Sequence, residues 1–495
     1  MKWRLFYMKK AFTKVISLVL CFALLFGLSA TSSAAETGIS RISCTVYGDT
    51  SSQKGFTWYT PQKTDTKIVI YDEAGQDVTA GLKIEYSCAE WQGNYVHKAI
   101  VSGLTAGAAY TYKVGDGAVW SDIGSFTTDD GDDSLNFIVI ADVQASSLEN
   151  FESAAKVVDK AFETMPEAEF FASLGDFTND STNAEWDAFS QAFGHITNST
   201  TLAAVPGNHD STSHWFENIF ALDTSESVQT RTGVNYSFDY GNVHFAVVNT
   251  NDLISVSEAQ LTWLRNDMNS TSADWKIVLM HKSPYTLGKD GKWPDALYLQ
   301  KSLAAVCDET NVDLVMSGHD HMYLRTKPLN DNKVVSQDAG TTYVLSGTAG
   351  TKRYEIRGFL LNNFVPQEVI DTCVIQKKGY GNYYNGTDFD SVDEANIGGC
   401  FNTVSVNGGN LVLNSYIVND EDGTVKIIDT FEISKAQGEN TATFSGENTT
   451  SSVQYAMTEI STLMHLARYA FLEWLPKFIK TLPEIIHTYR TTGTF

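Results

Sequence analysis

The chain has 495 residues, of which 43% are hydrophobic and 19% are charged. This composition favours packed cores over disorder, and the length is enough for two or three domains. The formal net charge is −24. A chain this acidic repels the nucleic acid backbone and anionic membranes at long range, which argues against either as a general partner.

Residues 1–35 have the pattern of a secretory signal peptide. Basic residues precede an apolar run over 15–28, and small residues follow at 33–35. The apolar run is shorter than the roughly 20 residues that a membrane-spanning helix needs. We therefore expect a cleaved leader and a secreted, extracellular protein rather than a transmembrane anchor.

Residues 38–128 have the pattern of an all-β sandwich. Short runs of alternating polarity, separated by turn residues, occur at 55–59, 67–71 and 97–101. The segment 103–114, with its tyrosines, and the early Trp58 resemble fibronectin type III-like domains. The acidic stretch 129–133 is expected to be a linker.

Residues 134–433 have the pattern of an α/β domain. Apolar runs typical of buried strands occur at 136–141, 169–174, 202–205, 243–248, 275–280, 312–316 and 342–345. Amphipathic helical patterns occur at 149–164, 183–193, 257–269 and 296–310. Strands alternating with helices predict a layered α/β fold. An irregular insertion is expected at 351–400, followed by strands at 411–418 and 424–433.

Two further segments follow this domain. Residues 436–453 are rich in Thr, Ser, Asn and Gly and are expected to be a linker. Residues 454–490 have an amphipathic helical pattern, interrupted by Pro476 and Pro483. The basic excess of this tail is small, so packing on a domain or a partner is favoured over contact with a membrane.

Five cysteines lie beyond the leader, and none has the spacing of a zinc site. In an oxidising compartment Cys44–Cys88 and Cys373–Cys400 could form disulfides, but the sequence does not fix the pairing. Cys307 lies in an apolar helical pattern and is expected to be a buried thiol. Metal ligands are therefore to be sought among histidine and aspartate.

Five of the expected strands end in side chains that can bind a metal ion. These side chains are Asp142, Asp176, Asn208, His281, and the pair His319 and His321. One such residue is more often a helix cap or an ordinary polar group. Five strand ends together indicate a site, because the carboxyl ends of such strands share one edge of an α/β sheet. A carboxylate can also bridge two ions about 4 Å apart.

In chain order these residues resemble the motifs of the calcineurin-like metallophosphoesterase superfamily. Asp142 is followed by Gly-Asp-Phe-Thr-Asn at 175–179, Gly-Asn-His-Asp at 207–210, His281, and Gly-His-Asp-His at 318–321. With the preceding sandwich, residues 38–433 resemble a purple acid phosphatase. The resemblance implies an αββα sandwich, in which two sheets are flanked by helices.

The resemblance also implies two metal ions per chain, which could be iron, manganese or zinc. Asp142 and His321 would bind the first ion, Asp176 would bridge both, and the second would be held by Asn208, His281 and His319.

Two positions depart from the family pattern. Many members carry Asp-x-His in the first motif, and purple acid phosphatases carry Asp-x-Gly with a tyrosine ligand from the second motif. Here Gln144 and Asn179 occupy the positions of that histidine and that tyrosine. Because tyrosinate bound to ferric iron gives the purple colour, this protein is not expected to be purple. Gln144 could still donate its amide oxygen to the first ion.

The expected function is hydrolysis of small phosphate monoesters by a hydroxide shared between the two ions. His209 is the expected proton donor to the leaving alkoxide, with Asp210 as the residue that orients it. Two other functions stay open. A phosphodiesterase or nucleotide hydrolase would use the same motifs, and Tyr285, Trp293 and Tyr323 could either stack on a substrate ring or pack.

The second open alternative is a secreted, non-catalytic binding protein on a degenerate metallophosphoesterase scaffold. It is motivated by the missing family ligand at Gln144 and by the large insertion at 351–400. The presence of the other ligands and of His209 argues against it, because a binding protein needs no acid.

Overall fold

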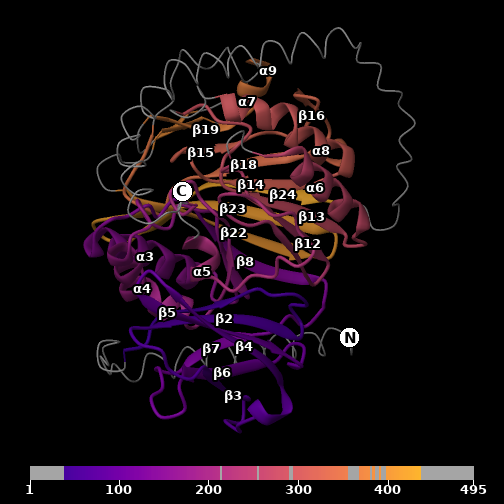
Figure 1. Cartoon of the computed structure of the whole chain (residues 1–495). Coiled ribbons are helices and arrows are strands. Elements are labelled where there is room, and N and C mark those ends of the chain that lie inside the picture. The colour runs from indigo at the N-terminus through magenta and orange to yellow at the C-terminus, as the bar shows by residue number, and fades with distance from the viewer. Residues whose placement is uncertain are drawn as a thin grey trace, which may run out of the picture.

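The computed structural model of the chain describes residues 38–211, 215–252, 256–288, 294–354, 367–378, 382–384, 389–391 and 397–435. The expected leader, the second linker and the C-terminal amphipathic helix lie outside these residues. Within the described ranges, no helix combines the length and the apolarity needed to cross a membrane. Figure 1 shows a β-rich N-terminal part, in indigo, below a larger α/β part.

The N-terminal part is a β-sandwich, as expected. One layer contains β1 (Ser40–Thr45), β2 (Gln53–Thr60), β5 (Asn94–Ser102) and β4 (Lys83–Trp91), and the other contains β3 (Lys67–Tyr71), β6 (Ala109–Gly115) and β7 (Gly124–Thr127). A short 3-10 helix, η1 (Thr79–Gly81), follows β3. Between the layers Phe56, Trp58 and Tyr112 are fully buried. The Tyr110 hydroxyl accepts a hydrogen bond from the Thr105 backbone N–H at 2.9 Å, as in the tyrosine corner of such sandwiches.

The sandwich is joined to the α/β part by a continuous sheet. Strand β1 pairs in parallel with β10 (Thr201–Ala204), which places Thr45 opposite Leu202. Arg41 strengthens this junction, because its Nε donates to Asp187 Oδ1 at 2.9 Å. In the stretch 129–133, Asp129 is buried and its Oδ2 accepts a hydrogen bond from the Gly241 backbone N–H at 2.8 Å across the junction, whereas residues 131–133 are exposed.

Two sheets packed face to face form the centre of the α/β part. The ten-stranded sheet continues from β10 through β9 (Phe170–Ser173), β8 (Ser134–Ile140), β22 (Ile397–Asn407), β23 (Asn410–Asn419) and β24 (Val425–Ser434). The nine-stranded sheet has the order β11 (Tyr236–Tyr240), β12 (Val243–Val248), β13 (Trp275–Met280), β14 (Leu314–Ser317), β18 (Thr342–Ser346), β15 (Tyr323–Arg325), β19 (Val374–Lys378), β20 (Asn382–Tyr384) and β21 (Phe389–Ser391).

Helices cover the outer faces of both sheets. On the ten-stranded sheet lie α3 (Leu148–Thr164), α4 (Asn183–Thr197) and α5 (Trp215–Ile219). On the nine-stranded sheet lie α6 (Glu258–Ser270), α7 (Pro294–Lys301), α8 (Leu303–Thr310) and α9 (Gln367–Ile370). A small hairpin, β16 (Leu329–Asn330) and β17 (Lys333–Val334), and a 3-10 helix, η3 (Gln337–Ala339), complete the described elements. The expected αββα order of layers is confirmed.

Two sequence-based expectations about elements are wrong in part. The helix expected at 296–310 is two helices, which meet at Ser302 (φ −113°, ψ −68°), and the Ser302 hydroxyl donates to the Tyr298 carbonyl at 2.7 Å. The insertion expected at 351–400 contains α9 and strands β19 to β21, and β22 begins within it. Strand β19 pairs with β15, so this segment extends the nine-stranded sheet.

The two disulfides considered from the sequence are absent from the described residues, and all five described cysteines are free thiols. Strands β2 and β5 separate the strands that carry Cys44 and Cys88, which is too far for a disulfide. Cys373 and Cys400 belong to hydrophobic clusters on different faces of the nine-stranded sheet. The expectation for Cys307 is confirmed, because its thiol is fully buried.

His244 joins three elements of the α/β part through two carboxylates. Its Nδ1 lies 2.6 Å from Asp239 Oδ1 on β11, and its Nε2 lies 2.9 Å from Asp267 Oδ2 on α6. Burial lowers the pKa of His244, but the hydrogen bonds and charges of the two carboxylates outweigh burial and raise it to about 9. The imidazolium therefore stabilises the folded state below the unfolded pKa, and this contribution is lost as the pH rises through the folded pKa.

We expect His244→Gln to lower the free energy of unfolding by about 2 kcal/mol at pH 6, with the difference from wild type vanishing above about pH 9. Urea unfolding at a series of pH values measures this difference. His195→Gln is the matched control, because the His195–Asp159 pair is more than half exposed on its histidine side and should contribute about 0.5 kcal/mol or less. If His244→Gln lowers the free energy of unfolding by the same amount at every pH, the imidazolium does not stabilise the folded state.

Candidate metal centre

The six expected ligands converge at one edge of the two packed sheets. Asp142, Asp176 and Asn208 follow β8, β9 and β10 of the ten-stranded sheet, whereas His281, His319 and His321 follow β13 and β14 of the nine-stranded sheet. Parallel pairing aligns the carboxyl ends within each sheet. The site is therefore built across the seam between the sheets.

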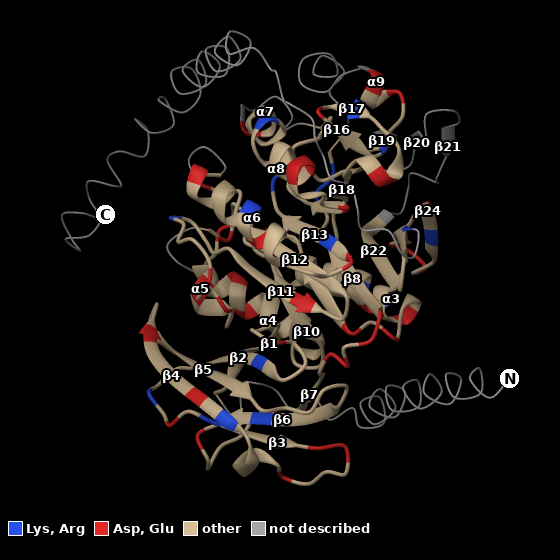
Figure 2. Cartoon of the chain, turned by 90° about the vertical axis from the view of Figure 1, so that its right-hand side faces the viewer, with Lys and Arg blue, Asp and Glu red and all other residues tan. Residues whose placement is uncertain are grey.

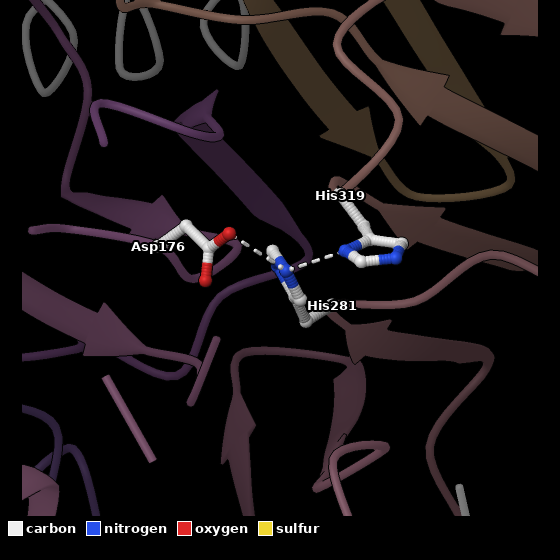
Figure 3. A group of neighbouring side chains, drawn as sticks. All are labelled: Asp176, His281 and His319. Carbon is white, nitrogen blue, oxygen red and sulfur yellow. Dashed lines mark hydrogen bonds and ion pairs between the residues drawn. The ribbon is translucent and has the colours of Figure 1, made fainter. Parts of the chain in front are cut away.

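His281 lies at the centre of one group of ligand atoms. Its Nε2 is 3.2 Å from Asp176 Oδ2, 3.0 Å from Asn208 Oδ1 and 3.2 Å from Nδ1 of His319. Figure 3 shows the Asp176 carboxylate and the His319 ring on either side of the His281 ring. Four potential ligand atoms thus point at one another, as they would around a shared cation.

A second group shares Asp176 with the first. His321 Nε2 lies 3.5 Å from Asp142 Oδ1. Asp142, Asp176 and His321 each offer one ligand atom within 4.8 Å of the others, and the same holds for Asp176, His281 and His319. Asp176 is the residue common to both groups.

Hydrogen bonds on the far side of two rings fix which nitrogen faces the site. His281 Nδ1 donates to the Leu174 carbonyl at 2.8 Å, and His321 Nδ1 donates to the Lys352 carbonyl at 3.1 Å. A carbonyl oxygen only accepts, so each Nδ1 carries a hydrogen and Nε2 is the nitrogen that faces the site and could bind a cation. Such outer contacts are typical of metal-binding histidines.

Backbone conformation is unusual at this edge of the sheets. Among the described non-glycine residues with positive φ are Asp142 at 54°, Gln144 at 35°, Asp176 at 54° and His319 at 75°. Left-handed conformations cost free energy for side chains of this kind and cluster where function requires them. Here they occur after β8, β9 and β14, at three of the five strand ends that carry candidate ligands.

Burial and charge together set the protonation of the ligands. Burial raises the pKa of Asp142 well above its usual range, and burial likewise lowers the pKa of His321 to about 3. Burial opposes both charges in the pair of Asp176 and His281, yet their mutual attraction prevails: the pKa of Asp176 is lowered, and that of His281 is raised to about 9. A buried cluster of this kind favours a bound cation, which would replace the proton as the positive partner.

The donor set fits metal ions. Imidazole nitrogens suit zinc and iron, and carboxylate and amide oxygens, which also suit manganese, complete mixed coordination. The buried side chain of Gln144 also fits, because its Oε1 has no hydrogen-bond partner. An unsatisfied buried amide oxygen is costly unless something else binds it.

His209 lies at the same edge without belonging to either ligand group. Its backbone N–H donates to Asp176 Oδ1 at 2.9 Å, and its ring is partly exposed. The ring contacts the Asn179 carbonyl through Nδ1 and the Gln144 amide nitrogen through Nε2.

The expectation that Asp210 orients the His209 ring is wrong. Both ring nitrogens of His209 have other partners, and the Asp210 carboxylate accepts instead from the backbone N–H groups of Phe177, Thr178 and Gly207, at 2.9 to 3.2 Å. Burial raises the pKa of Asp210 to about 7. Asp210 therefore holds together the loops that contain residues 175–179 and 207–210, and it does not orient the His209 ring.

The aromatic residues considered for substrate stacking are packing residues where they are described. Tyr285 and Tyr323 are buried, and the Tyr323 hydroxyl donates to Asp429 at 2.7 Å. Trp293 lies outside the described residues.

One further strand end contributes to the site, although the sequence motifs do not include it. Residues 347–350 follow β18, and there the Thr348 hydroxyl donates to the Asp142 carbonyl at 2.8 Å. Two residues further on, the Lys352 carbonyl holds the His321 ring. The sequence does carry a signal for this strand end, because Ser-Gly-Thr-Ala-Gly at 346–350 follows the apolar run at 342–345.

Comparison with known proteins agrees with this geometry. Residues 135–323 match the calcineurin-like phosphoesterase family, and residues 39–128 match the N-terminal domain of purple acid phosphatases. Residues 135–323 therefore form a calcineurin-like phosphoesterase domain, and a purple acid phosphatase N-terminal domain precedes it. The protein is a phosphoesterase hydrolase by family.

Individual relatives are distant. Purple acid phosphatase 21 of Arabidopsis thaliana is 22% identical over 316 residues, which cover 61% of this chain and 68% of that protein. Probable inactive purple acid phosphatase 1 of the same plant is 24% identical and covers 52% of this chain and 49% of its own length. The solved structure of purple acid phosphatase PPD1 from yellow lupin superposes with a TM-score of 0.61 at 17% identity, covering 80% of this chain and 74% of that one.

We expect Gly207→Ala to lower metal content and phosphoesterase activity about 10-fold or more. An added Cβ would lie 2.0 Å from the Asp176 backbone nitrogen and 2.2 Å from its Oδ1, so Asp176 must move. Metal analysis and activity assays on purified protein measure the effect. Gly194→Ala is the control: its Cβ enters open space on α4, and it should raise stability by about 0.5–1 kcal/mol with no change in activity. Equal metal content in both variants would contradict the account of Gly207.

Proposed function

We propose that this protein is a secreted phosphomonoesterase of the acid phosphatase type with two metal ions in its site. The observation that carries the proposal is the sharing of Asp176 between the two ligand groups. Asp142, His321 and the Gln144 oxygen would hold one ion. Asn208, His281 and His319 would hold the other, with Asp176 between them. Bound in this way, the ions would supply an activated water and stabilise charge on the phosphoryl oxygens.

The residues of the chain would do the remaining work. His209 would protonate the leaving oxygen, because its ring borders the ligand groups while both its nitrogens stay out of them. Neutral His319 and His321, favoured by burial, would keep their lone pairs available as ligands. The presence of an acid in addition to the ligands supports an enzyme over a non-catalytic binding protein.

Export is proposed on the leader pattern in residues 1–35. When the full chain is expressed in a secreting host, N-terminal sequencing should find mature protein in the medium starting near residue 36. Recovery of protein that retains the leader would contradict export by a cleaved signal.

We expect the purified protein to bind two ions of manganese, iron or zinc and to hydrolyse p-nitrophenyl phosphate faster than bis(p-nitrophenyl) phosphate. Asp176→Asn should lower this activity by about 100-fold or more and reduce the bound metal, because it removes the shared carboxylate. Asp65→Asn, at an exposed site on the sandwich, is the control. Preference for the diester would assign the site to a phosphodiesterase, and absence of both metal and hydrolysis would sink the proposal.

We expect His209→Ala to keep wild-type metal content and to lower hydrolysis of an alkyl monoester, glycerol 2-phosphate, by about 100-fold or more. Hydrolysis of p-nitrophenyl phosphate should fall much less, because nitrophenolate leaves without a proton. His195→Ala, exposed on α4, should change neither rate. Equal losses on the two esters would show that His209 does not act as the acid.

A further inference from the structure

The segment that follows β18 runs along the group of Asp142 and His321. Gly350 N–H donates to the Asp142 carbonyl at 3.2 Å, and Tyr354 N–H donates to the His321 carbonyl at 2.9 Å. Between these two contacts, the Lys352 carbonyl accepts from His321 Nδ1 at 3.1 Å. The Tyr354 ring also stacks on the His321 ring, with 4.5 Å between the ring centroids. The backbone of Lys352 is therefore fixed beside the ligand groups on both of its sides.

The Lys352 side chain reaches from this segment to the second motif. Its Nζ donates to Asn179 Oδ1 at 2.7 Å. The Asn179 amide is held in this orientation, because its Nδ2 donates to Asp180 Oδ2 at 2.8 Å. The backbone carbonyl of Asn179 contacts the His209 ring. A single residue thus separates the Lys352 ammonium from the ring that borders the ligand groups.

The ammonium stays at the surface while the ligands lie below it. Lys352 is exposed, whereas Asp142, Asp176 and His321 are almost completely buried. An ester whose phosphoryl group meets the buried ligands must therefore extend its alcohol part outward, past the surface residues. The chain has a formal net charge of −24, which repels anions at long range. A fixed cation at the edge of the site offsets this repulsion locally and can bind a carboxylate or a phosphate.

We propose that Lys352 is a specificity-determining residue that binds a second anionic group, a carboxylate or a phosphate, on the alcohol part of the substrate. The preferred substrates are then phosphate monoesters whose alcohol carries such a group a few carbons from the ester oxygen. This inference rests on the proposed function and deepens it, because it names the class of substrate. The proposal follows from position: Lys352 lies one residue beyond His209, on the way from the buried ligands to solvent.

Two esters with the same carbon skeleton test this inference. 3-Phosphoglycerate differs from glycerol 1-phosphate only in having a carboxylate in place of the CH2OH group. We expect the wild-type KM to be about 5-fold lower for 3-phosphoglycerate, as one exposed charge-assisted contact would give. Lys352→Gln should remove this difference, and Lys352→Arg should keep most of it. In the wild type, about 0.5 M NaCl should weaken the difference by screening.

Two further measurements do not depend on turnover. Metal content should be the same in Lys352→Gln and wild type, because the substitution leaves the backbone carbonyl that holds His321. Calorimetry with the phosphonate analogues of the two esters, in which a CH2 group replaces the ester oxygen, should show the same difference in affinity. Lys156→Gln removes one exposed positive charge from α3 and is the matched control, with no change expected in either KM.

A second pair of esters identifies the anion. Comparing fructose 1,6-bisphosphate with fructose 1-phosphate shows whether a phosphate is recognised as well as a carboxylate, and a preference in either pair that depends on Lys352 supports the inference. Equal KM values within both pairs, a preference that Lys352→Gln leaves intact, or loss of metal from Lys352→Gln would overturn it. The proposed function fails differently, since the wild-type protein itself would then hold no metal or cleave none of these esters.

Discussion

Buried charge at the seam of two sheets is the constraint on which this site depends. Asp142, Asp176 and His281 are almost completely withdrawn from water. Carboxylates in such surroundings are costly unless a cation or several donors face them. The backbone donors are few, and the remaining lone pairs point inward at one another. Bound cations would neutralise the carboxylates of such a cluster. They would also offset the negative net charge of the chain, which otherwise repels an anionic phosphate ester. Figure 2 shows acidic residues spread over both the sandwich and the α/β part.

The fold supplies what the cluster needs. Two separate sheets deliver three ligands each, so neither sheet alone can form the site. Positive φ values occur at three of the strand ends, and the close approach of the loops leaves no room for a Cβ at Gly207. The Asp210 carboxylate accepts hydrogen bonds from three backbone N–H groups of these loops. Rigid loops keep the ligands in place, as pre-organised sites require.

Most of the layers and ligands could be predicted from the sequence, because each depends on a local pattern. Apolar runs identified β8 to β10 and β12 to β14, and the polar residues after five of these six strands identified the candidate ligands. Pairing between strands that are far apart in the sequence produces no such local pattern. The partner of β19 and the passage of one sheet from β10 into β1 depend on contacts between distant segments. The role of Asp210 was missed for the same reason: its partners are backbone groups of another loop, which no side-chain motif records.

The most direct test of two cations at the seam is anomalous X-ray diffraction from crystals grown with zinc or manganese. We predict two peaks per chain, both about 2.0–2.2 Å from carboxylate oxygens of Asp176. One peak should have His321 beside it, and the other His281 and His319. A single peak, or two peaks that do not share Asp176, would contradict the account.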